Sequence, residues 1–155
     1  MDTIPFTKET YDTLKKELET LKAVERPHIL QEIAEARAQG DLSENFEYHA
    51  AKDQQGKIES RIQVLEDKIA RAVIIEHDTA SADRVLFGAT VKVKDLDLGK
   101  EYEYTLVSPE GSDPVNGKIS SVSPIGKALL GKAKGDKVEV QTPKKLINLE
   151  ILGYK

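Results

Sequence analysis

The sequence predicts a two-domain α + β protein: an N-terminal antiparallel α-helical coiled-coil hairpin, followed by a small antiparallel sheet with one helix. Two observations lead to this prediction. In the first half, apolar residues recur at steps of three and four, the period of an amphipathic helix. After residue 83, apolar and polar residues alternate, the period of half-buried strands. We therefore expect a hairpin domain over residues 1–76, a linker over 77–82 and a second domain over 83–155.

The first helix is expected to begin at Lys8, because Thr7 before it is a suitable N-cap. Pro27 lies within this helical pattern, and proline lacks the N–H that the preceding turn needs. The apolar period resumes beyond Pro27, so we predict a kink and not a stop. Gly40 is well placed to end the helix. The apolar face consists of Tyr11, Leu14, Leu18, Leu21, Ile29, Ile33 and Ala36.

The second helix is expected to start near Ser43. Its apolar positions alternate steps of three and four, which is the heptad pattern of a coiled coil. Two such helices joined by a short turn form an antiparallel hairpin. The turn then lies at the far end of the hairpin, and it carries Asp41 and Glu44. The heptad positions are Tyr48, Ala51, Gln55, Ile58, Ile62, Leu65, Ile69 and Ala72.

The second domain is expected to be a twisted antiparallel sheet with one helix packed on a face. Ser123 is a suitable cap for that helix, Pro124 suits its first turn and Gly131 ends it. The alternating segments that predict strands are residues 89–94, 101–106, 118–122, 137–141 and 146–151.

The charge distribution narrows the possible partners. Residues 1–78 contain 11 Lys and Arg against 17 Asp and Glu, a net charge of −6, whereas residues 79–155 contain 12 against 10, a net charge of +2. An acidic first half argues against a protein that binds duplex DNA by itself, because such proteins usually present a basic surface to the DNA. It favours a protein partner, or a role in which the carboxylates themselves act.

The sequence also argues against a membrane protein and against a protein held together by disulfides. No apolar run approaches the roughly 20 residues that cross a bilayer, so we expect no membrane partner. The chain has no cysteine, which excludes disulfides and thiolate metal sites and suits a cytoplasmic location.

Two blocks of sequence resemble a known family. The run Gly40-Asp41-Leu42-Ser43-Glu44-Asn45, with the residues up to Gln55, is similar to the hairpin turn of the Gre transcript-cleavage factors, and closer to their GreA branch. The run from Ser123 to Lys132 resembles the C-terminal signature of the same family. Phe46 departs from the pattern, because a small residue is expected at that position.

The resemblance implies a function. It implies that the protein binds bacterial RNA polymerase, inserts its hairpin into the secondary channel and stimulates endonucleolytic cleavage of the 3′ end of backtracked nascent RNA. It also implies that the second domain is FKBP-like and docks on the rim of that channel. We expect a cytoplasmic monomer that is not itself an enzyme, because it would stimulate the hydrolytic activity of the polymerase.

Asp41 and Glu44 carry the predicted chemistry. By itself, Asp-x-x-Glu before a helix is an ordinary capping arrangement. The resemblance instead implies that both carboxylates reach the polymerase active centre and act there in trans. Phosphodiester hydrolysis suits two metal ions, and Mg²⁺ prefers oxygen ligands. We therefore expect no cofactor of the protein's own, but a Mg²⁺ ion that Asp41 and Glu44 share with the polymerase.

Arg37, Ser43 and Lys52 are candidates for contact with RNA or polymerase. Arg37 and Lys52 lie near the turn, where RNA phosphates would attract them without sequence preference. Ser43 either caps the second helix or contacts the polymerase. Lys57 and Arg61 are interpreted as part of a solvated face that balances the acids.

Three other functions stay open at this point. The protein could occupy the polymerase channel as an inhibitor without cleavage activity, or act as a hairpin adaptor or chaperone. An FKBP-like fold also raises peptidyl-prolyl isomerisation. Such sites are usually apolar pockets lined by aromatic residues. This half of the chain has one Phe, Phe87, and no Trp, which argues against an isomerase site.

Overall fold

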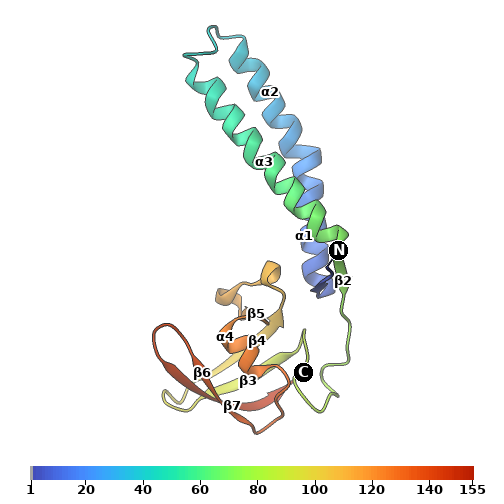
Figure 1. Cartoon of the computed structure of the whole chain (residues 1–155), viewed down its shortest axis with the longest axis vertical. Helices are drawn as coiled ribbons and strands as arrows, with labels where there is room; N and C mark the ends of the chain where they lie inside the picture. The colour runs from blue at the N-terminus through green and yellow to red at the C-terminus, as the bar shows by residue number, and fades with distance from the viewer. Residues whose placement is uncertain (1) are drawn as a thin grey trace. The chain divides into compact units, whose positions relative to one another are not determined.

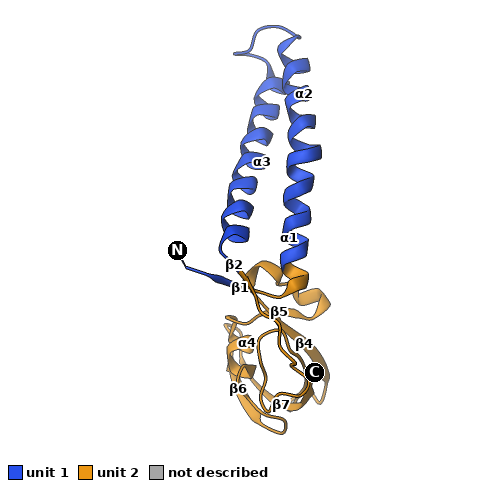
Figure 2. Ribbon diagram, turned by 90° about the vertical axis from the view of Figure 1, so that its right-hand side faces the viewer, with its two compact units in different colours: residues 1–4, 11–72 blue, residues 5–10, 73–155 orange. Residues whose placement is uncertain are grey.

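The structure is a computed structural model and describes residues 2–155. Its contacts divide the chain into two compact units (Figure 2). One unit contains residues 11–72 with the segment up to Ile4, and the other contains residues 5–10 and 73–155. The two-domain α + β class predicted from the sequence is confirmed, whereas the boundaries of the linker over 77–82 stay a prediction. Within residues 2–155, no helix is both long enough and apolar enough to span a bilayer.

The first arm of the hairpin continues through Pro27 by means of a wider helical turn. It comprises α1 (Lys8–Thr20), a π-helical segment (Leu21–Glu25) and α2 (Arg26–Arg37). Proline has no N–H to offer the turn before it, so an uninterrupted α-helical ladder is impossible there. The N–H of Arg26 instead donates to the carbonyl of Leu21, five residues earlier. The predicted continuation of the helix is confirmed, and the irregularity is a π-turn.

The second arm is the single helix α3 (Phe46–Ala70), which lies beside the first arm (Figure 1). Two parts of the sequence prediction are wrong here: the helix starts at Phe46 and not near Ser43, and Ala72 belongs to strand β2 (Ala72–Ile74). β2 pairs with β1 (Ile4–Phe6) in a two-stranded ladder, which the sequence did not indicate.

The seam between the arms is apolar, as the periodicity predicts. Each member is less than 9% exposed, and Ile62 and Leu65 are almost completely buried. Removal of this surface from water is the main stabilising contribution to the hairpin. The buried members are Leu14, Leu21, Ile29, Ile33 and Ala36 of the first arm and Ala51, Ile58, Ile62 and Leu65 of α3.

Ion pairs connect the two arms beside the apolar seam. Arg26 donates two hydrogen bonds to the carboxylate of Glu59, at 2.7 and 2.8 Å. Arg61 donates two to Glu17, both at 2.9 Å. Arg61 is exposed and balances an acid, in agreement with its interpretation from the sequence. The sequence did not indicate which acid, because Glu17 and Arg61 are 44 positions apart and only the paired arms bring them together.

The second unit contains a five-stranded sheet in the order β5-β4-β3-β7-β6, with α4 (Pro124–Leu129) packed against it. All neighbouring strands are antiparallel except β4 and β5, which run parallel. The sheet is therefore mixed at one edge and not wholly antiparallel. The reason is the long connection from β4 to β5, with turns at 109–111 and 114–116, which brings the chain back in the same direction. The strands are β3 (Thr90–Asp95), β4 (Glu101–Val107), β5 (Lys118–Ser120), β6 (Lys137–Gln141) and β7 (Leu146–Tyr154).

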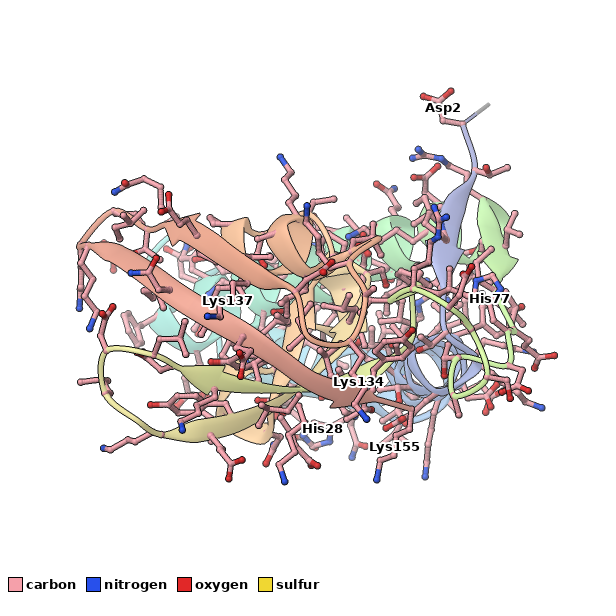
Figure 3. The ribbon with its side chains drawn as sticks, turned by 90° about the horizontal axis from the view of Figure 1, so that it is seen from below. Asp2, His28, His77, Lys134, Lys137 and Lys155 are labelled. Carbon is pink, nitrogen blue, oxygen red and sulfur yellow. The ribbon has the colours of Figure 1, made fainter. Side chains whose placement is uncertain are left out.

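Local signals in the sequence correctly located α4. The N–H of Gly126 donates to the hydroxyl of Ser123 at 3.1 Å, so Ser123 caps the helix as predicted. Gly131, just beyond the helix, has a φ of +81°, which glycine adopts without strain. The inner face of α4 buries Leu129 against the sheet core, which includes Val91, Leu106 and Ile151. The exposed basic residues of this unit include Lys134, Lys137 and Lys155 (Figure 3).

Candidate functional site at the hairpin tip

The candidate site is the loop between α2 and α3, residues 38–45, here called the tip loop. It lies at one end of the hairpin, and β2, which follows the C-terminal end of α3, lies at the other (Figure 1). The loop starts with a hydrogen bond from the N–H of Gln39 to the carbonyl of Ala36, at 3.1 Å. Gly40 follows with a φ of +129°, a conformation that L side chains rarely adopt. α2 nevertheless ends at Arg37 with Ala38 as its C-cap, so the prediction that Gly40 ends the helix is wrong: Gly40 lies in the loop beyond the cap.

Asp41 is exposed and is oriented by Ser43. One carboxylate oxygen, Oδ1, accepts hydrogen bonds from the backbone N–H of Ser43 at 3.0 Å and from its hydroxyl at 2.9 Å. These two bonds, the backbone bond first, lower the pKa of Asp41 below its ordinary value. The side chain is therefore charged at neutral pH. Oδ2, the other carboxylate oxygen, has no hydrogen-bond partner within residues 2–155.

Glu44 is also exposed, three residues further along the same loop. Its carboxylate has no hydrogen bond or ion pair with any residue of the described chain, 2–155. No lysine or arginine of the hairpin neutralises either acid. The tip loop therefore presents two carboxylates to the surroundings, and neither is folded back into the seam.

Asn45, and not Ser43, caps α3. The side-chain oxygen of Asn45 accepts a hydrogen bond from the N–H of Tyr48 at 3.0 Å. The hydroxyl of Ser43 is already donated to Asp41. The capping interpretation of Ser43 is wrong, because α3 begins at Phe46 and its N-cap position therefore falls on Asn45. Sequence reasoning could have found Asn45, since asparagine is as good an N-cap as serine and is followed by a helical pattern.

Arg37 and Lys52 flank the tip loop on the two arms. Arg37 is the last residue of α2, is exposed and has no ion-pair partner among residues 2–155. Lys52 is exposed on α3 and donates to the neutral side-chain amide of Gln55 at 2.9 Å, so its charge is not neutralised. Within residues 2–155, neither cation forms a bond with Asp41 or Glu44.

Phe46 is the first residue of α3 and is 83% exposed. It therefore does not stiffen the tip loop through packing. It adds apolar surface directly after the acidic loop, where a partner would meet it.

The acids of the tip loop are too few to hold a metal ion alone. No group of three or more His, Asp or Glu side chains within residues 2–155 is placed to bind one. Mg²⁺ prefers six oxygen ligands and keeps several waters, so two carboxylates can supply part of such a site but not all of it. The donor chemistry thus fits a shared ion, with further ligands from a second molecule.

The fold and the tip together define a class: a two-domain α + β protein that presents an acidic loop on a coiled-coil hairpin. Residues 4–74 match the family described as "Transcription elongation factor, N-terminal", and residues 80–154 match "Transcription elongation factor, GreA/GreB, C-term". The chain belongs to the GreA/GreB family of transcription elongation factors. The resemblance predicted from the two sequence blocks is confirmed.

Two relatives with similar sequences agree with this assignment. The chain is 52% identical to a protein of Thermodesulfovibrio yellowstonii named transcription elongation factor GreA, over 97% of this chain and 96% of that one. It is 50% identical to the protein of the same name from Chlorobium phaeobacteroides, again over 97% and 96%. A solved structure of GreA factor homolog 1 from Thermus thermophilus is 30% identical over 99% of both chains, with a TM-score of 0.45.

Proposed function

We propose that this protein stimulates the cleavage of backtracked RNA by bacterial RNA polymerase. The hairpin enters the secondary channel, and the tip loop brings Asp41 and Glu44 to the polymerase active centre. The protein has no hydrolytic activity of its own, but supplies these two carboxylates in trans. Cleavage removes the displaced 3′ end of the nascent RNA and leaves a new 3′ end in register.

The observation that carries this proposal is the pair of exposed carboxylates that no basic side chain of the hairpin neutralises. A protein that used the hairpin only as an adaptor would have no need of unpaired acids in its turn. An inhibitor that merely filled the channel would not need them either. Their free oxygens suit ligation of a Mg²⁺ ion shared with the polymerase, which would stabilise negative charge at the reacting phosphate.

The second domain is proposed to dock on the rim of the secondary channel and hold the hairpin in place. Its excess of basic residues, a net charge of +2 over residues 79–155, suits an acidic surface. The protein would act as a monomer in the cytoplasm, because one channel admits one hairpin.

The proposal is tested with purified elongation complexes that have been halted and have backtracked. RNA labelled at its 3′ end is incubated with Mg²⁺, with and without the wild-type protein. We expect the protein to accelerate the release of short labelled fragments. Slower RNA extension without fragment release would instead show that the protein is an inhibitor. If neither extension nor fragment release changed, the result would favour the adaptor function.

Arg37 and Lys52 are proposed to guide the RNA. Neutralising both, as Arg37→Gln and Lys52→Gln, is expected to weaken crosslinking of the protein to the RNA 3′ end about tenfold, because each cation loses its attraction to phosphate. Crosslinking is measured in the same halted complexes. The matched control is Lys16→Gln with Lys57→Gln, which removes the same charge from exposed positions away from the tip loop. Equal crosslinking by the two double variants would refute the guiding role.

A further inference from the structure

The side chain of Asn45 connects both arms of the hairpin across the tip loop. Its Oδ1 accepts a hydrogen bond from the N–H of Tyr48 in α3 at 3.0 Å. Its Nδ2 donates a hydrogen bond to the carbonyl of Ala36 in α2 at 2.5 Å. Ala36 is itself buried in the seam, so the carbonyl that receives this bond belongs to a fixed part of the first arm. One side chain thus closes the loop that contains both acids.

The remaining bonds of the tip loop are local and do not replace this connection. Asp41 bonds to Ser43 two residues away, and Gln39 bonds back to Ala36 within the end of α2. The ring nitrogen of His49 lies 3.4 Å from the carbonyl of Ser43, which is the outer limit of a hydrogen bond. Gly40 adds backbone freedom in the middle of the loop. Without Asn45, the loop would be tied to α2 only at its start.

We infer that Asn45 is the positioning residue of the tip loop: its amide holds the loop against the end of α2, so that Asp41 and Glu44 are presented in one arrangement. This inference rests on the proposed function for its effect on cleavage, but its effect on the loop does not depend on it. Asparagine suits the role because it carries an acceptor for the helix cap and a donor for the opposite arm on one short side chain.

The substitution that separates the two roles is Asn45→Ser. Serine caps a helix about as well as asparagine, but its one oxygen lies closer to the backbone than the asparagine amide nitrogen and cannot reach the carbonyl of Ala36 while it accepts from Tyr48. α3 should therefore keep its cap while the connection to α2 is lost. The comparison variant Asn45→Ala loses both the cap and the bond to Ala36. The difference between Asn45→Ala and Asn45→Ser therefore measures the effect of losing the cap.

The first measurement is the order of the backbone in the free, full-length protein, from ¹⁵N relaxation. In Asn45→Ser we expect the order parameters of residues 40–44 to fall from about 0.85, typical of ordered backbone, to below about 0.6. The value at Tyr48 should not change, because its cap remains. If residues 40–44 keep wild-type order in Asn45→Ser, the inference is overturned.

The second measurement is fragment release from halted complexes over a range of protein concentrations. We expect Asn45→Ser to lower the rate at saturation about tenfold, as expected for loss of one well-placed hydrogen bond, and to leave the half-saturating concentration unchanged. A role confined to helix stability would leave the saturating rate of Asn45→Ser at the wild-type value. A disordered loop combined with a wild-type rate would therefore also overturn the inference.

The two measurements keep this inference separate from the proposed function. If the wild-type protein releases no fragments, the proposed function fails. The order parameters then decide the inference by themselves: a fall confined to residues 40–44 supports it, and unchanged values reject it.

Discussion

Replacing Asp41 with Asn and Glu44 with Gln should reduce the stimulated cleavage rate at least about 100-fold, the scale seen when a charge-stabilising group is removed from an active centre. Both substitutions preserve the shape of the side chain and remove its charge. The amide oxygen at position 41 can still accept the two hydrogen bonds from Ser43 that orient Asp41. The loss therefore reports the missing carboxylates and not a rearranged loop.

The measurement is the rate of fragment release from halted complexes at saturating protein. Binding to polymerase is followed separately, by competition between the variant and labelled wild-type protein, and should be unchanged. The control is Glu47→Gln with Asp53→Asn, which removes the same charge from exposed positions of α3. It should keep nearly the wild-type rate. A full rate in the Asp41/Glu44 variant would disprove the proposed role of the tip loop.

Gly126→Ala should destabilise the second unit by roughly 1–3 kcal/mol, the usual cost of forcing an extra methyl group into a packed site. A Cβ at this position would lie 2.1 Å from the carbonyl oxygen of Ser120 and 2.9 Å from the Cα of Ser121. Both atoms belong to the backbone, so no rotamer change can relieve the overlap. Either α4 must move away from the end of β5, or the cap at Ser123 must open.

The free energy of unfolding in urea checks this prediction, with the signal of the sheet followed separately from that of the helices. Gly56→Ala is the matched control, because Gly56 lies in α3 and a Cβ there meets nothing within 4 Å. Alanine is the better helix former by about 1 kcal/mol, so the control should be stabilised. If both variants show the same change, close packing at Gly126 is not the reason that glycine stands there.

The candidate site was accessible to sequence reasoning only in part. Asp41 and Glu44 are local in sequence, and resemblance to a family sufficed to single them out. The sequence offered both Ser43 and Asn45 as acceptable caps, but it did not show which of them caps α3, because that depends on where the helix begins in the folded hairpin. Asn45 also bonds to the carbonyl of Ala36, nine residues earlier, and only the closed hairpin brings these groups within reach.

By itself, the sequence determined the periodic features of the protein: the two arms and their buried seam, the alternating strands of the second unit, and the helix between Ser123 and Gly131. Each depends on side chains within a turn or two of one another, so the pattern survives without the rest of the chain. Only the tertiary structure decided the parallel pairing of β4 with β5, the ladder of β1 with β2 and the pairing of Glu17 with Arg61. These contacts join residues far apart in the sequence, and no local pattern records which distant backbone or charge the folded chain will bring near.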